Sequence, residues 1–100
     1  MAKYLWRGSY TAEGSKAILR DGGKKRVEAV VHTVAGLGGK VEAFYFGFGT
    51  DDFYVVVDLP DNATAASASL TMCASGVASV ETVALLTPEE LDVAATKIVL

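Results

Sequence analysis

Residues 40–60 read KVEAFYFGFGTDDFYVVVDLP, and this stretch decides the fold. Two runs dense in aromatic and β-branched residues flank a short polar break at residues 49–52. That arrangement is typical of two strands joined by a tight turn. Neither run alternates cleanly between apolar and polar residues, although an antiparallel hairpin with one solvated face should do so. The hairpin is apolar on both faces, and both faces therefore need cover.

The period-two rule assigns each side chain of the hairpin to a face. In the first strand the two expected sets are Val41, Ala43 and Tyr45 on one face, and Phe44, Phe46 and Phe48 on the other. In the second strand they are Phe53, Val55, Val57 and Leu59 against Tyr54, Val56 and Asp58.

Composition limits the class of protein. The chain has 100 residues, which fits a single domain over residues 1–100. Hydrophobic residues make up 51% and charged residues 21%, more apolar side chain than one small core easily hides, which favours a homodimer or higher homo-oligomer. A net charge of −3 argues against nucleic-acid and membrane partners. With one cysteine and neither a signal peptide nor a membrane span, we expect a soluble cytoplasmic protein.

The residues before the hairpin predict one strand and two helical segments. Residues 3–10 form the strand, with Tyr4, Trp6, Gly8 and Tyr10 on one face. Thr11 caps a short helix that ends at residue 19 or 20, and the sequence Asp21-Gly22-Gly23 interrupts it. Asp21 could cap the longer helix over residues 24–37, in which valines at helical spacing form one apolar stripe. Gly38 or Gly39 ends that helix in the left-handed conformation.

The residues after the hairpin predict a helix, a strand and a final helix. Asp61 or Asn62 caps a small-residue helix that continues to Ala74, and Gly76 stops it. Residues 77–86 form the fourth strand. The sequence Thr87-Pro88-Glu89-Glu90 is a capping box with proline at the first helical position. The last helix has a modest apolar face that consists of Leu91, Ala94, Ala95 and Ile98.

This order predicts an α+β fold, the ferredoxin-like βαββαβ arrangement with a C-terminal helix. Both main helices then cover one face of a four-stranded antiparallel sheet and leave the other face bare. Since the hairpin is apolar on both sides, a second copy of the sheet is the simplest cover for the bare face.

The residues also carry a resemblance to a known family. The segments KYLWRGSYTAEG, LGGKVEAFYFGFG, VVVDLPDNATAA and LLTPEELDVA together resemble the GYD family of small bacterial proteins. The resemblance implies a ferredoxin-like subunit of the dimeric α/β-barrel group, and it implies no activity, because the family is one of unknown function. The Gly-Tyr-Asp motif is altered here: Gly49-Thr50-Asp51-Asp52 has threonine where the tyrosine would fall.

Two sets of residues are candidates for a ligand or catalytic site. His32, the only histidine, could act as a general base, or it is simply a surface residue of the long helix. Trp6, Tyr10, Tyr45 and Tyr54 could line a cleft for a small aromatic or carbonyl ligand, or they fill the core and the subunit interface.

Three further features have a functional and a structural interpretation. Gly22, Gly23, Lys24, Lys25 and Arg26 place cations at a helix start, where an anion could bind, although a solvated charge run explains them as well. Asp51 and Asp52 could share a proton or hold a cation, but turns favour aspartate for local hydrogen bonding. Cys73 is expected to be a buried small hydrophobe.

Two functions remain open at this point. In the first, the homodimer closes its sheets into a barrel and binds a small apolar or aromatic ligand in a cleft or in the barrel. In the second, a cofactor-independent enzyme of isomerase or oxygenase type acts on a small carbonyl or phenolic compound. His32, Tyr10, Tyr45 and Tyr54 would be its catalytic residues. No metal motif is evident, and we expect no cofactor.

Overall fold

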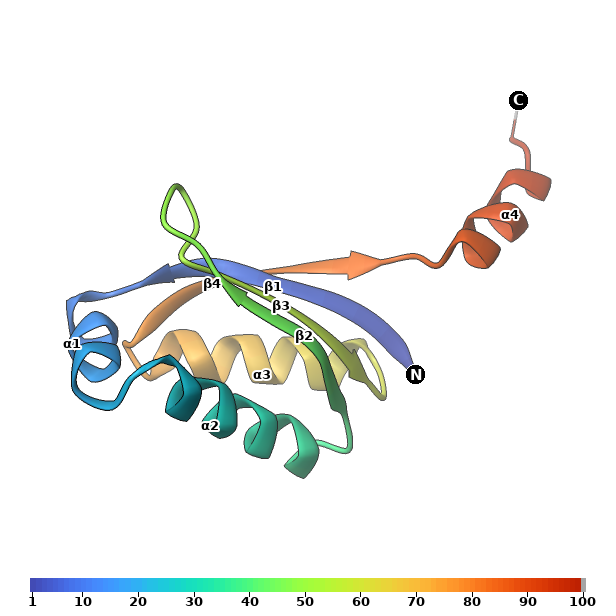
Figure 1. Ribbon diagram of the computed structural model, residues 1–100. Helices are drawn as coiled ribbons and strands as arrows, with labels where there is room; N and C mark the ends of the chain where they lie inside the picture. Colours follow the sequence, from blue (N-terminus) through green and yellow to red (C-terminus); the bar gives the residue numbers. More distant parts are fainter. Residues whose placement is uncertain (100) are drawn as a thin grey trace.

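The computed structural model describes residues 1–99, as one antiparallel sheet with helices on one face and one helix apart from both (Figure 1). The elements in chain order are β1 (Ala2–Tyr10), α1 (Ala12–Asp21), α2 (Gly23–Gly36), β2 (Lys40–Phe46), β3 (Phe53–Leu59), α3 (Asn62–Ala74), β4 (Ala78–Leu85) and α4 (Pro88–Thr96).

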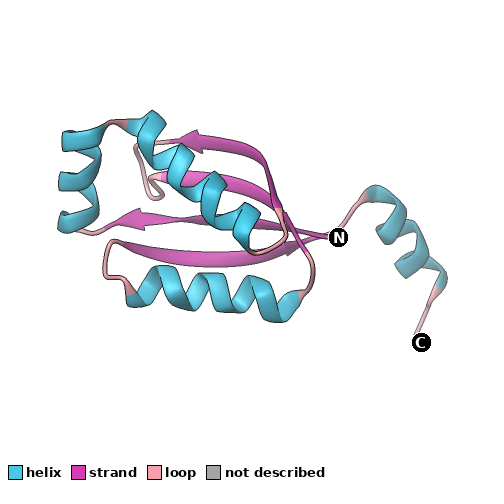
Figure 2. Ribbon diagram, turned by 90° about the horizontal axis from the view of Figure 1, so that it is seen from below, coloured by secondary structure: helices cyan, strands magenta, loops and turns pink. Residues whose placement is uncertain are grey.

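The sheet has the strand order β2-β3-β1-β4, and every neighbouring pair is antiparallel. Figure 2 shows α2 and α3 side by side across one face of the sheet, with α1 at its end. This topology confirms the predicted ferredoxin-like α+β fold and the predicted bare face.

The core lies between the sheet and the two helices. β1 contributes Tyr4 and Trp6, which are 3% and 2% exposed. β3 contributes the whole expected inner set, Phe53, Val55, Val57 and Leu59. On the helical side, the core is closed by Val34 of α2 and by two alanines of α3, Ala65 and Ala68. The small side chains of α3 let this helix lie close to the sheet, as its composition indicated.

The face predicted for the side chains of the first hairpin strand, β2, is wrong near the start of the strand. A β-bulge shifts the register between Val41 and Ala43, so that Val41 pairs with Val57 while Ala43 pairs with Val56. Val41 therefore lies on the inner face, the same face as Phe44. The expected tight turn is also longer, because the loop spans residues 47–52. Phe48 lies in this loop, fully exposed, and not on a strand face.

Side-chain caps begin three of the helices as the sequence predicted. Thr11, Asp61 and Thr87 each accept a hydrogen bond from the first turn of α1, α3 and α4. The suggestion that Asp21 caps α2 is wrong, because Asp21 ends α1 and the cap position is Gly22. Gly22 has φ +85°, a conformation that favours glycine and lets the chain change direction between the helices.

The outer face of the sheet, opposite the helices, combines an apolar row with ion pairs. Register places four apolar residues in one row across all the strands: Ala43, Val56, Leu5 and Val83. On one side of this row Lys3 bonds to Glu42 and to Asp58, the latter at 3.0 Å. On the other side Arg7 lies 3.3 Å from Glu81. Among the described residues, no helix covers this face, and the loop between β2 and β3 contacts it only at one end, through Ser9 and Arg7 (Figure 1).

Helix α4 stands away from the rest of the molecule (Figures 1 and 2). Its capping box is formed, with Thr87 and Glu90 bonded reciprocally, so the local sequence specifies the helix. All of its residues are exposed, including Leu91 and Val93, which are 60% and 56% exposed. Within residues 1–99, no helix is both long enough and apolar enough to cross a membrane.

Candidate ligand groove between α2 and α3

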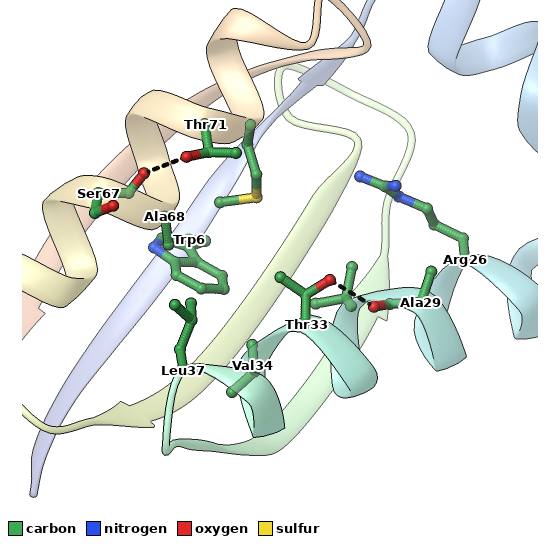
Figure 3. Close-up of a pocket in the computed structure, with 11 residues that line it drawn as sticks. Trp6, Arg26, Ala29, Thr33, Val34, Leu37, Ser67, Ala68 and Thr71 are labelled. Atoms are coloured by element: carbon green, nitrogen blue, oxygen red, sulfur yellow. Dashed lines mark hydrogen bonds between the residues drawn. The ribbon is translucent and has the colours of Figure 1, made fainter.

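A groove lies between α2 and α3 with the sheet as its floor (Figure 3). Its volume is about 170 Å³. It is lined by Trp6 of β1, by Arg26, Ala29, Val30, Thr33, Val34 and Leu37 from α2 and its C-cap, and by Ser67, Ala68, Thr71 and Met72 of α3. The lining is mostly aliphatic and aromatic, with few polar groups, which is the usual character of a small-molecule site.

Trp6 forms the aromatic part of the floor. Figure 3 shows its indole ring beneath Ala68, with the ring nitrogen on the side of α3. The Nε1 atom is buried and has no hydrogen-bond partner among the described residues. Thr82, the β4 residue that pairs with Trp6 in the sheet, also has a buried hydroxyl oxygen without a partner. Two unpaired polar atoms therefore lie in neighbouring strands under α3, where such groups are normally satisfied.

Arg26 is the charged residue of the groove. It begins in the second turn of α2, and its side chain extends across one end of the groove, while Leu37 lies at the other end (Figure 3). The guanidinium carbon is 5.7 Å from the centre of the Tyr10 ring. Burial raises the pKa of the Tyr10 hydroxyl, and the adjacent Arg26 acts in the opposite direction. The Nε atom of Arg26 is buried, with no partner among residues 1–99.

Two of the three hydroxyl groups of the groove, those of the threonines, are already used as donors. The Oγ1 of Thr33 donates to the carbonyl oxygen of Ala29 at 3.0 Å, and the Oγ1 of Thr71 donates to that of Ser67 at 2.8 Å. Both bonds stay within their own helix, as threonine side chains in helices commonly do. The threonines can therefore accept a hydrogen bond from a ligand. The guanidinium of Arg26, the Nε1 of Trp6 and the hydroxyl of Ser67 are the lining donors without a partner among the described residues, and Arg26 is the charged one.

The four aromatic candidates do not form one cleft. Trp6 lines the groove, and Tyr10 lies below it against Phe53, with ring centres 5.0 Å apart. Tyr45 and Tyr54 are cross-strand partners on the outer face, 71% and 41% exposed. The sheet thus separates the candidates into two pairs, and only the pair on the inner face lies near the groove.

His32 is exposed and does not line the groove. It lies on α2, six residues beyond Arg26, which is about 9 Å along a helix axis. Tyr10 lies at the Arg26 end, and Tyr45 and Tyr54 lie on the opposite face of the sheet. The structure therefore brings together no histidine–tyrosine constellation of the kind that the catalytic hypothesis requires.

The fold keeps only part of the expected anion site at the start of α2 together. Gly22, Lys25 and Arg26 line one depression beside α1, and Asp21, a carboxylate, lines the same depression. Lys24 is exposed and does not line it, and Arg26 also lines the groove. Binding of an anion by Gly22, Gly23, Lys24 and Arg26 stays a prediction.

The aspartates of the hairpin loop have structural contacts. The carboxylate of Asp52 accepts the backbone N–H of Tyr10 at 3.0 Å, and its own N–H donates to the carbonyl of Gly8 at 2.7 Å. Asp51 lies 3.9 Å from Arg7. These contacts fit the local hydrogen-bonding role. The expectation for Cys73 is wrong, since it is exposed on the side of α3 away from the sheet-facing Ala65, Ala68 and Met72.

Sequence reasoning missed most of the groove, although the chain carried a signal for it. Residues 26, 30, 33 and 37 follow the spacing of one helical face, so Arg26 belongs with the apolar stripe of α2 and not with the exposed Lys24 and Lys25. Its basic neighbours concealed this assignment, because three successive cations suggest one solvated run.

Together the fold and the groove define a ferredoxin-like α+β domain with an apolar groove of about 170 Å³ on its helical face. A family model described as the GYD domain matches residues 4–95. The chain belongs to this family of small proteins of unknown function. A search of curated proteins and a search of solved structures each gave no match.

Proposed function

We propose that this chain is a homodimeric small-molecule-binding protein whose ligand occupies the groove between α2 and α3. The groove itself carries this proposal: it is enclosed by two helices, apolar in lining, and holds one inward-turned cation. An apolar cavity of about 150 Å³ in another protein takes up benzene. A volume of about 170 Å³ thus suits a single six-membered ring with a small substituent.

Binding is tested by blocking the groove. Ala29 and Ala35 are both exposed residues of α2, and of the two only Ala29 lines the groove. We expect Ala29→Phe to weaken the binding of monocyclic compounds at least about tenfold, because the new ring fills the ligand volume. Ala35→Phe should leave binding unchanged. Titrations with benzyl alcohol, benzamide and benzoate, followed by the fluorescence of Trp6, give the affinities. Absence of saturable binding for all three compounds would reject the groove as a ligand site.

The accessible surface area of the chain is larger than that of a typical monomer, which supports the dimer. A monomeric globular protein of this mass has an accessible area of about 5,400 Å², whereas this chain exposes 6690 Å². The radius of gyration is 15.1 Å, against about 13 Å for a compact domain of 100 residues. The excess, roughly 1,300 Å², exceeds the ~800 Å² that each partner buries in a standard interface.

A second copy of this chain would cover both exposed apolar surfaces. The outer row of Ala43, Val56, Leu5 and Val83 is suited to sheet-on-sheet packing, which needs apolar inner faces about 10 Å apart. Its flanking charges include both signs, so a two-fold partner can place cation against carboxylate. Helix α4 projects beyond the body of its own subunit and would pack on the partner. Sedimentation equilibrium at micromolar concentration distinguishes this dimer from a 10.5 kDa monomer.

A further inference from the structure

The charge of Arg26 has no counterpart in its own surroundings. Within residues 1–99, no carboxylate lies within 4.0 Å of the guanidinium. Two acidic residues lie near Arg26 in sequence. Glu28 is exposed and has no ion pair among the described residues, and Asp21 is bonded to Arg20 at 3.0 Å. The buried Nε of Arg26 has no acceptor either. A buried N–H without a partner costs free energy, and a cation that is partly removed from water costs more, so this group is suited to an incoming anionic acceptor.

The position of Arg26 relative to the groove limits the shape of that acceptor. The guanidinium lies at one end of a cavity that otherwise offers a ring-sized apolar space over Trp6. The Tyr10 ring lies at cation–π distance from the guanidinium, and this contact favours the observed position of the charged group. A planar guanidinium matches the two oxygens of a carboxylate better than a spherical ion.

We infer that the ligand of the groove is a monocyclic apolar or aromatic compound that carries a carboxylate. Its ring lies on Trp6 between α2 and α3, and Arg26 binds the carboxylate at the end of the groove. This inference rests on the proposed function, because it names the ligand class of the same site. The exposed Lys24 has no part in it, since its side chain does not line the groove.

The decisive comparison uses benzoate and its neutral analogue benzamide, which have the same ring and nearly the same shape. Trp6 is the only tryptophan of the chain and lines the groove, so its fluorescence reports both titrations. We expect the dimeric wild-type protein to bind benzoate about tenfold or more tightly than benzamide, because hydrogen bonds to a charged partner are the stronger ones. Benzyl alcohol should bind no more tightly than benzamide.

Two variants distinguish a specific contact of Arg26 with the carboxylate from a general effect of the positive charge of α2. Arg26→Gln should lower benzoate affinity to that of benzamide and leave benzamide affinity within about twofold. Lys24→Gln, the same charge change two residues earlier, should leave the preference for benzoate intact. Circular dichroism checks that both variants fold, and the comparison in the wild-type protein stands even if Arg26→Gln does not.

Each outcome of this test is informative. If benzamide binds in the groove as tightly as benzoate, the carboxylate inference is wrong and the proposed ligand groove stands. The inference is also wrong if Lys24→Gln abolishes the preference and Arg26→Gln does not. If none of the three compounds binds, the proposed function and the inference fail together.

Discussion

Adjacent residues of β3 have opposite environments. Val55 and Val57 are 2% and 0% exposed beneath the helices, whereas Val56, between them, lies on the uncovered outer face. In isolation the three valines are chemically identical, and only their direction from the strand differs. The inner face is covered by the helices of the same chain. The outer face has a comparable apolar row, which no helix among residues 1–99 covers, and this is the pattern expected where a second subunit completes the structure.

The sharpest test of this comparison places the same charge on each face. Val57→Asp should lower the free energy of unfolding by on the order of 4–5 kcal/mol, because it places an unpaired carboxylate in the core, and this is a large part of a total stability of about 5–15 kcal/mol. Val56→Asp should leave the fold intact and shift the protein to a monomer. Circular dichroism and sedimentation equilibrium measure the two effects. A dimer that survives Val56→Asp would show that the outer row is not the interface.

The second largest effect is expected for α4. Like the outer face, this helix has exposed apolar side chains, but it belongs to no layer of the fold. A chain that ends at Leu86 should retain the cooperative unfolding of the body, because α4 covers none of it. Its dimer dissociation constant should rise at least about tenfold, since several buried aliphatic side chains each contribute about 1.5–3 kcal/mol when fully covered.

Two matched substitutions test whether the apolar side chains of α4, and not merely its presence, stabilise the dimer. Leu91→Ser should weaken the dimer in the intact chain, and Glu89→Ser on the same helix should not. Equal dissociation constants for the truncated and full-length chains would exclude α4 from the dimer interface.

The smallest effect comes from the ion pairs of the outer face. The hydrogen bond from Lys3 holds the pKa of Asp58 below its usual range. A lowered carboxylate pKa stabilises the fold above the ordinary aspartate pKa, and this contribution is lost as the pH falls through the folded-state value. Asp58→Asn should therefore reduce the loss of stability between neutral pH and about pH 3.

Urea unfolding at several pH values measures this difference. Asp92, an exposed carboxylate of α4 without an ion pair among the described residues, provides the control substitution Asp92→Asn. Parallel pH profiles for the wild type and Asp58→Asn would mean that the bond from Lys3 contributes nothing measurable.

Local signals in the sequence predicted most of the fold. Thr11, Asp61 and Thr87 cap helices because their side chains bond only a few residues ahead, and this requires no knowledge of the tertiary structure. Gly38 and Gly76 have positive φ near the helix ends where the sequence placed breaks. The alternation in β3 was also correct, because this central strand has no bulge.

What the sequence did not predict depends on partners far along the chain. The bulge next to Glu42 is a property of the pairing between β2 and β3, and a period-two rule applied to one strand cannot detect it. The exposure of Cys73 depends on which side of α3 meets the sheet. The groove combines residues from β1, α2 and α3, so only the inward direction of Arg26 could be inferred, from its spacing to Val30 and Leu37.

The alternation of β1 has a thermodynamic consequence. Trp6 lies in the floor of the groove, while its neighbours Leu5 and Arg7 lie on the outer face, so one strand separates the two proposed binding surfaces by a single layer of backbone. Linkage requires that any factor by which ligand tightens the dimer equals the factor by which dimerisation tightens the ligand. Benzoate affinity can be measured at protein concentrations above and below the dimer dissociation constant. The ratio of the two affinities then gives the coupling free energy between the two faces directly.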